Sequence, residues 1–87
     1  MTRREQRCKE VQKVLNDYKI EYKKFYNNEG FLKIKNTPFY IEVSNRYIDI
    51  AYKDGKYFNY LKPFEEIIEF RDFVSKNGTN FMMLKGE

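Results

Sequence analysis

The sequence contains no histidine and no tryptophan, and it has one cysteine, two prolines and four glycines. Because the sequence has no histidine, it cannot form a Ser-His-Asp or a Cys-His nucleophilic system. The lone cysteine, Cys8, excludes an internal disulfide and, in the absence of histidine, a structural zinc site. No glycine-rich phosphate loop or dinucleotide fingerprint occurs. We therefore expect no enzymatic activity, no cofactor and no metal site.

Long apolar runs are also missing. No stretch approaches the roughly 18 consecutive apolar residues of a membrane span, and no signal-peptide pattern opens the chain. A single cysteine is typical of a reducing compartment. These features predict a cytoplasmic protein with no membrane partner. At 87 residues the chain is expected to form one domain, 1–87, with a thin core that its eight tyrosines and eight phenylalanines supply.

Charge is spread unevenly along the chain. Residues 1–35 hold ten Lys/Arg and five Asp/Glu, whereas residues 36–87 hold seven and eight, so the first part carries +5 and the second −1, which gives the net charge of +4. Such a basic half either binds a polyanion or only keeps the surface soluble. Arg3, Arg4 and Arg7 crowd the first turns of an expected helix, where the dipole disfavours cations. They are candidate phosphate contacts, and the alternative is a solvated helix end.

The chain from 37 to 61 predicts three antiparallel strands. Side chains alternate between the two faces of a strand, so Ile41 should lie opposite Ile50 and Val43 opposite Ile48. This register requires a four-residue or two-residue loop at 44–47, where Asn45 suits a positive φ.

The next turn contains Asp54 and Gly55. A two-residue turn formed by them would place Ile50 opposite Asn59 and mix the faces. A three-residue loop at 53–55 places Ile50 opposite Phe58, so we expect that register with Gly55 left-handed.

Elements around this meander complete the expected fold. Thr2 and Glu5 form a capping box for a helix over 3–18, and two strands are expected at 20–26 and 31–35, joined by a loop at 27–30. Leu32 and Ile34 should point inward. The apolar stripe of the first helix is formed by Cys8, Val11, Val14, Leu15 and Tyr18.

A second helix should begin at Lys62-Pro63 and end at Asn77-Gly78. Residues 81–84 either dock on the core or add an edge strand. The predicted class is α+β: an N-terminal helix, an antiparallel meander of four to five strands and a C-terminal helix, with both helices on one sheet face. The apolar face of the second helix is formed by Phe64, Ile67, Ile68, Phe70 and Val74.

The sheet face away from the helices is the main candidate for a binding surface. Tyrosines among lysines resemble a base-stacking platform or a protein-binding hot spot, although tyrosine also simply favours strands. Glu42 and Asp49 should oppose each other there, where they either hold a cation or lie beside a lysine or arginine. The residues predicted to bind a partner are Lys33, Lys35, Tyr40, Tyr47, Lys53 and Tyr57.

A second charged surface is expected on the C-terminal helix. Glu65, Glu69 and Asp72 line one side of it. This acidic stripe is either a solvated helix face or a contact for a basic partner.

The order helix, three strands, helix resembles the double-stranded-RNA-binding domain in outline. That family begins its second helix with a lysine cluster, whereas this chain has Pro63-Phe64-Glu65-Glu66, so the RNA-binding function does not carry over. The chain is rich in Lys, Asn, Ile, Tyr and Phe, with one Ala, as AT-rich coding produces. In this composition, in size and in style it resembles small phage or mobile-element proteins that inhibit host defence, such as anti-CRISPR proteins.

This resemblance implies a non-catalytic protein that binds and blocks a host protein or nucleoprotein. The alternative is a nucleic-acid-binding accessory module that uses the basic N-terminal half.

Overall fold

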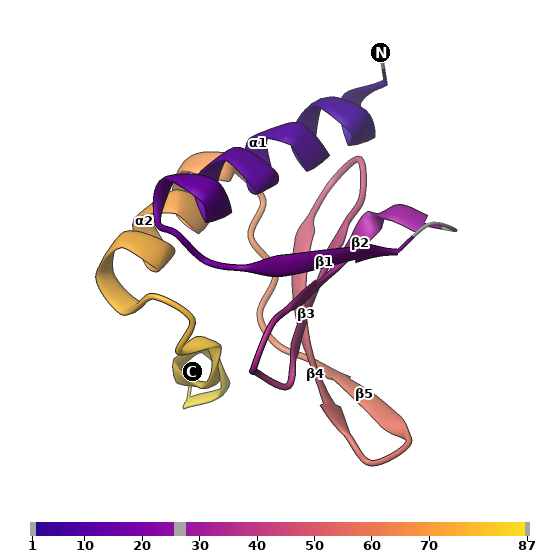
Figure 1. Cartoon of the computed structure of the whole chain (residues 1–87), viewed down its shortest axis with the longest axis vertical. Coiled ribbons are helices and arrows are strands. Elements are labelled where there is room, and N and C mark those ends of the chain that lie inside the picture. Colours follow the sequence, from indigo (N-terminus) through magenta and orange to yellow (C-terminus); the bar gives the residue numbers. More distant parts are fainter. Residues whose placement is uncertain (1, 26–27, 87) are drawn as a thin grey trace.

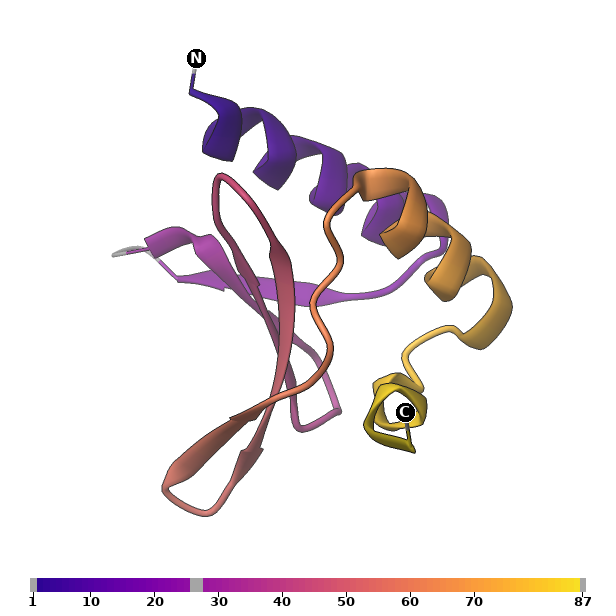
Figure 2. The ribbon, with the colours of Figure 1, turned by 180° about the vertical axis from the view of Figure 1, so that it is seen from behind.

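We describe residues 2–25 and 28–86 of a computed structural model, and only the backbone at 28, 29, 85 and 86. The strands form one antiparallel sheet in chain order, and both helices lie on the same side of it (Figures 1 and 2). This confirms the predicted α+β architecture. The elements are α1 (Arg3–Asp17), β1 (Tyr22–Phe25), β2 (Asn28–Ile34), β3 (Phe39–Val43), β4 (Ile48–Asp54), β5 (Tyr57–Tyr60), α2 (Ile67–Asn77) and a 3-10 helix, η1 (Phe81–Gly86).

The first helix begins where the capping residues predict. The backbone N–H of Glu5 donates to the Thr2 hydroxyl at 3.1 Å, and this hydroxyl donates to the Glu5 carboxylate at 3.2 Å. Cys8 is buried on the core side with Val11, Val14 and Leu15, as predicted. Tyr18 is not part of the buried stripe, because the helix ends at Asp17 and Tyr18 is exposed.

The second strand starts earlier than predicted. β2 begins at Asn28, so residues 28–30 are strand and not loop, while Tyr26 and Asn27 lie outside the described residues. Leu32 and Ile34 are buried, as predicted. A register shift between Lys24 and Phe25 ends the regular pairing of β1 with β2.

The β3–β4 register is the predicted one, with Val43 opposite Ile48 and Ile41 opposite Ile50. Asn45 does not have the positive φ expected of it. Instead, the Ser44 hydroxyl accepts the backbone N–H of Tyr47 at 3.0 Å, and the Ser44 N–H donates to the Tyr47 carbonyl at 2.9 Å. A serine side chain therefore closes this turn without a left-handed residue.

The predicted β4–β5 register is wrong. Asp54 pairs with Tyr57, which leaves a two-residue loop, Gly55-Lys56. Gly55 has the expected positive φ, 63°. A positive φ at the first loop position only is the pattern of a type II′ turn. As a result Ile50 lies beside Leu61, and the Leu61 N–H donates to the Ile50 carbonyl at 2.8 Å. Phe58 opposes Lys53.

The segment before α2 is extended and not helical. Phe64 and Ile48 exchange backbone hydrogen bonds of 2.8 and 2.9 Å, so the chain keeps following β4. One extra residue separates this pair from the Leu61–Ile50 contact, and such a bulge accommodates Pro63, which has no N–H to donate. The predicted start of the second helix at 62 is therefore wrong.

The C-terminal helix buries a narrower face than predicted. Phe64, Phe70 and Val74 are buried and Ile67 is partly buried, but Ile68 is exposed. Phe73, which was not on the predicted face, packs against the core. Gly78 ends the helix with a φ of 61°, and its N–H donates to the Val74 carbonyl at 2.8 Å. The predicted C-cap is therefore confirmed.

The described residues after α2, up to residue 86, dock on the core and add no strand. Phe81 is fully buried, and its ring centroid lies 5.4 Å from those of both Phe39 and Phe73. η1 thereby closes the side of the core that the two long helices leave open (Figure 2).

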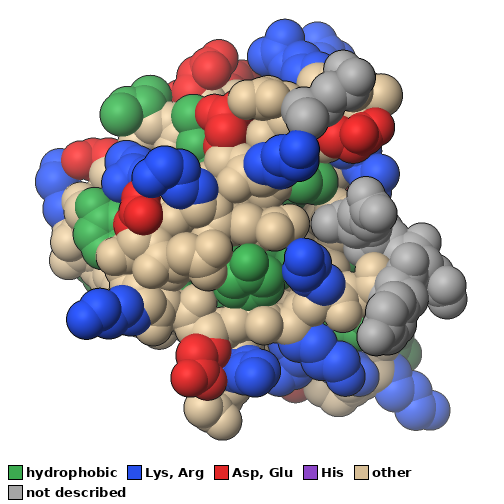
Figure 3. All heavy atoms as spheres, turned by 45° about the horizontal axis from the view of Figure 1, so that its top comes forward, with side chains coloured by type: hydrophobic (Ala, Val, Ile, Leu, Met, Phe, Trp, Pro, Cys, Tyr) green, Lys and Arg blue, Asp and Glu red, His purple; other side chains and the backbone are tan. Residues whose placement is uncertain are grey.

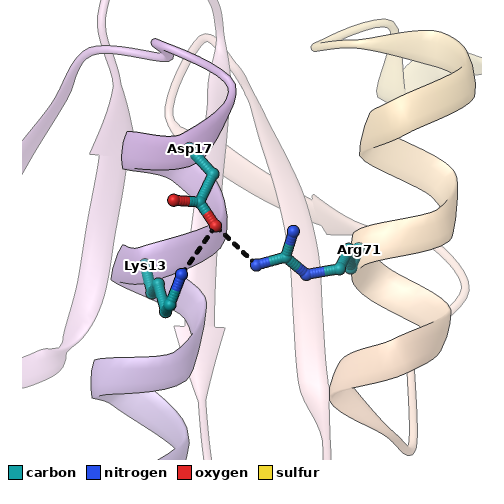
Figure 4. Close-up of polar contacts among 3 residues, drawn as sticks. All are labelled: Lys13, Asp17 and Arg71. Carbon is teal, nitrogen blue, oxygen red and sulfur yellow. Dashed lines mark hydrogen bonds and ion pairs between the residues drawn. The ribbon is translucent and has the colours of Figure 1, made fainter.

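An ion-pair cluster joins the two long helices on the surface (Figure 4). Asp17 at the end of α1 accepts from Arg71 of α2 at 2.6 Å and from Lys13 at 3.0 Å. These hydrogen bonds, first that from Arg71, lower the pKa of Asp17 below its ordinary value of 3.8. The cluster therefore stabilises the fold only while Asp17 is ionised.

Replacing Asp17 by asparagine should reveal this dependence on pH. Because the folded-state pKa is lowered, the ion pairs contribute fully above the unfolded-state pKa and are lost as the pH falls through the folded-state pKa. The parent protein should be more stable than Asp17→Asn at neutral pH, and the difference should begin to shrink below about pH 4 and vanish only below the lowered folded-state pKa. Urea unfolding from pH 7 to pH 2.5 measures this. High salt at pH 7 should shrink the difference, because the groups are exposed. An unchanged difference at low pH would contradict the assignment.

Charges of both signs are mixed over the side of the molecule that α1 crosses (Figure 3). No helix in the part of the chain that the structure describes has both the length and the apolar composition of a membrane span.

Candidate functional site

The candidate site is the sheet face opposite the helices, here called the outer face. α1, α2 and η1 leave it uncovered in both ribbon views (Figures 1 and 2). The strand register decides which side chains share it, because opposed residues point to the same side. These side chains are Lys23, Phe25, Phe31, Lys33, Tyr40, Glu42, Asp49, Ala51, Lys53, Phe58 and Tyr60.

Four aromatic rings pack together on the outer face. The Tyr40 centroid lies 5.4 Å from that of Phe31 and 5.0 Å from that of Phe58, and Phe25 lies 5.3 Å from Phe31. Tyr40 is only 8% exposed as a result. We call Phe25, Phe31, Tyr40 and Phe58 the aromatic cluster. It is a second, small apolar core outside the main one, and Tyr40 is its buried member.

The most exposed aromatic rings of this surface lie on β5. Phe58 is 43% exposed at the edge of the aromatic cluster, and Tyr60, two residues further on the same face, is 56% exposed. The observed β4–β5 register places both rings on the outer face. The predicted register placed Phe58 and Tyr60 among the core residues, so they were missed as candidate site residues. Gly55 as the first residue of a type II′ turn is the sequence signal that could have revealed them.

The two ends of the outer face differ in charge. Lys23 opposes Lys33 beside the aromatic cluster, and the Lys33 ammonium lies 5.9 Å from the Tyr40 ring centroid. At the other end Glu42 opposes Asp49, as predicted. No lysine or arginine among the described residues forms an ion pair with these two carboxylates. The expected neutralising neighbour is therefore not found in the described part of the chain.

The acidic end is electrostatically perturbed. Burial raises the pKa of Asp49. Burial, and then the nearby carboxylates of Glu42 and Asp49, raise the pKa of the Tyr60 phenol. Tyr60, a residue of β5, is therefore close enough to Glu42 and Asp49 for these carboxylates to act on its phenol. Within the described ranges no three acidic or cysteine side chains gather where they could hold a metal ion.

The residues predicted to bind a partner do not form one patch. Lys33, Tyr40 and Lys53 lie on the outer face, with Tyr40 buried. Tyr57 is 75% exposed but points to the opposite side of β5. Tyr47 lies in the 44–47 turn, and Lys35 follows β2 at the far end of the sheet. The predicted position is therefore wrong for Tyr57, because the observed β4–β5 register turns its side chain to the other side of the strand, and partner binding by the remaining residues stays a prediction.

Two of the three N-terminal arginines have partners inside the protein. Arg4 Nε donates to the Val43 carbonyl at 3.1 Å. Arg7 is only 5% exposed, and its guanidinium donates to the Glu65 carbonyl at 2.9 Å. These contacts fasten α1 to β3 and to the segment before α2, which accounts for cations in the first turns of a helix. Arg3 remains exposed, in a shallow hollow next to Arg46. Phosphate binding by these arginines stays a prediction.

The acidic stripe is shorter than predicted. Glu65 precedes α2 and therefore is not on the helix. Glu69 is in the first turn and is exposed. Asp72 pairs with Lys76 at 3.1 Å within the helix. The remaining stripe consists of Glu69 and a partly neutralised Asp72.

No protein-family model, no curated protein and no solved structure matches this chain.

Proposed function

We propose that this protein is a non-catalytic binding protein that covers a site on a larger protein partner with its outer face. One observation carries the proposal: the rings of Phe58, a member of the aromatic cluster, and of Tyr60 are exposed on a sheet face that neither long helix covers. Aromatic rings supply much contact area and lose little conformational entropy on binding. Lysines at one end and carboxylates at the other give the surface an orientation.

The size of the molecule suits this role. A standard protein interface buries about 800 Å² on each partner. The described surface is 5883 Å², so one sheet face can supply such an area. The partner that we propose is a host protein or nucleoprotein in the cytoplasm, and the effect is inhibition or modulation, as the resemblance to small phage-encoded inhibitors of the anti-CRISPR type implies.

A second candidate function is binding of single-stranded nucleic acid. It is favoured by the opposed Lys23 and Lys33 beside the rings of the aromatic cluster. Bases stack on aromatic rings while lysines contact phosphates, and such binding weakens steeply as salt rises. The carboxylates of Glu42 and Asp49 on the same face would repel a phosphate backbone, which is why we rank a protein partner first.

Replacing Tyr60 by alanine should weaken partner binding by about tenfold or more, because it removes the most exposed ring of the outer face. The melting temperature should change little, since the ring is mostly solvated. The matched control is Tyr57→Ala, which removes a tyrosine of the same strand on the opposite side and should leave binding unchanged. Capture of a partner from host lysate, followed by titration with the purified partner, measures both variants.

Capture with and without nuclease separates the two candidate functions. Capture that survives nuclease and falls in Tyr60→Ala supports the protein partner. Capture that nuclease abolishes supports the nucleic-acid candidate. Loss of binding in Tyr57→Ala but not in Tyr60→Ala would show that the outer face is not the site.

A further inference from the structure

The two edges of the sheet differ in how they are protected. β1, at one edge, carries Lys23 and Lys24 and ends its regular pairing in a register shift. Charged side chains and irregular pairing are devices that keep an edge strand from pairing with another chain. β5, at the other edge, reads Tyr-Phe-Asn-Tyr, with neither a charge nor a proline. Figures 1 and 2 show no other element beside its outer border.

The backbone of β5 offers hydrogen-bonding groups to this border. Leu61 donates its N–H to Ile50 in β4 at 2.8 Å. In an antiparallel ladder residues alternate between facing the neighbouring strand and facing away from it. Tyr57, Asn59 and Leu61 therefore direct their backbone groups toward β4. The N–H and C=O groups of Phe58 and Tyr60 point outward, in the direction of a further strand.

We propose that β5 is a docking edge to which an extended segment of the partner protein adds as a further strand of the sheet. The inference rests on the proposed function and supplies its binding mode, since strand addition combines backbone hydrogen bonds with side-chain contacts on alternate residues. The added strand would continue the outer face, where its apolar side chains would meet the exposed rings of Phe58 and Tyr60.

The charges around β5 indicate which kind of partner segment can pair with this strand. Lys56 and Lys62 are exposed at its two ends, and Lys53 opposes Phe58 across the hairpin. The partner segment should therefore have an alternating apolar centre and acidic residues on both sides of it. A second copy of this chain fits less well, because a two-fold pairing centred on Asn59 would bring Lys56 of one copy opposite Lys62 of the other.

Two synthetic peptides test the proposal on the full chain. Both have an alternating Thr-Val centre, one with glutamates at each end and the other with lysines. We expect the glutamate peptide to bind at least about tenfold more tightly. It should also slow hydrogen exchange at the amides of Phe58 and Tyr60, measured by NMR, while the inward-pointing amide of Asn59 changes less. Equal binding of both peptides, no binding at millimolar peptide, or binding without protection of these two amides would overturn the proposal. Protection that appears without peptide and grows with protein concentration would also overturn it, in favour of a second copy.

A pair of variants at Tyr60 separates strand addition from other binding at the outer face. Tyr60→Pro removes an outward N–H and leaves the bonds to β4 in place, whereas Tyr60→Val keeps the N–H. Both variants lack the Tyr60 ring and differ in the N–H, so the proline variant should bind the glutamate peptide about tenfold or more weakly than the valine variant. Equal binding by the two variants would overturn the proposal. If the proline variant does not fold, amide exchange in the parent protein decides. Should the Phe58 and Tyr60 amides stay unprotected while Tyr60→Ala still loses the captured partner, the proposed function stands and strand addition fails.

Discussion

Replacing Phe81 by alanine is expected to lower the free energy of unfolding by about 3–5 kcal/mol, the cost typical of removing a fully buried aromatic ring. Phe81 has no exposed surface and packs edge-on against Phe39 and face-to-face with Phe73. Its removal would leave a cavity between β3 and α2 that the surrounding rings cannot fill. For a domain of this length such a loss is a large part of the total stability. Urea unfolding followed by circular dichroism measures it.

Met83→Ala is the matched control for Phe81→Ala. Met83 belongs to the same 3-10 helix but is mostly exposed, so its truncation should change the stability by less than about 0.5 kcal/mol. Equal, small effects of the two variants would mean that the C-terminal segment is not docked. Equal, large effects would mean that the whole segment, and not the Phe81 ring, carries the stability.

Gly30→Val should lower the free energy of unfolding by about 2–3 kcal/mol, through overpacking and not through loss of a contact. A Cβ atom at Gly30 would lie 2.8 Å from the Val43 carbonyl oxygen and 2.6 Å from Arg4 Nη2. The arginine can move, but the carbonyl belongs to the neighbouring strand. β2 and β3 would have to separate, and the Arg4–Val43 hydrogen bond of 3.1 Å would be strained or lost.

Making Gly30→Val in a protein that already carries Arg4→Ala distinguishes crowding by the Arg4 side chain from crowding by the Val43 carbonyl. In that background Gly30→Val should still be strongly destabilising, because the Val43 carbonyl remains in the way. If the second substitution costs nothing once Arg4 is removed, the crowding comes from the arginine alone, and the close approach of the strands is refuted. The difference between the single and double variants measures how strongly the two sites are coupled.

Much of the fold follows from local patterns in the sequence. Thr2 and Glu5 fix the start of α1 because a hydroxyl and the N–H three residues later satisfy each other within one turn. The β3–β4 register follows from the alternation of apolar residues. Ile41 and Val43 on β3 must share a face with Ile48 and Ile50 on β4, and these residues are close together in the chain. Gly55 and Gly78 mark a turn and a helix end, since both positions require a positive φ.

Some features of the site needed the tertiary structure. The β4–β5 register places Phe58 on the outer face, where Phe31 and Tyr40 bury part of its ring. Apolar residues of this hairpin were expected on the core side, but the helices do not extend over its end (Figure 1), so burial there is gained on the outer face. Arg4 likewise finds a partner 39 residues away. No local pattern encodes such contacts.

The sequence by itself therefore determined the order of the elements, the α+β class and the inward side chains of β2 to β4. Short-range rules of capping and alternation are sufficient for these. Only the tertiary structure decided which side chains gather on the outer face, which arginines are used internally and where the C-terminal segment docks. These depend on how far α1 and α2 reach across the sheet, which is set by packing between residues distant in the chain.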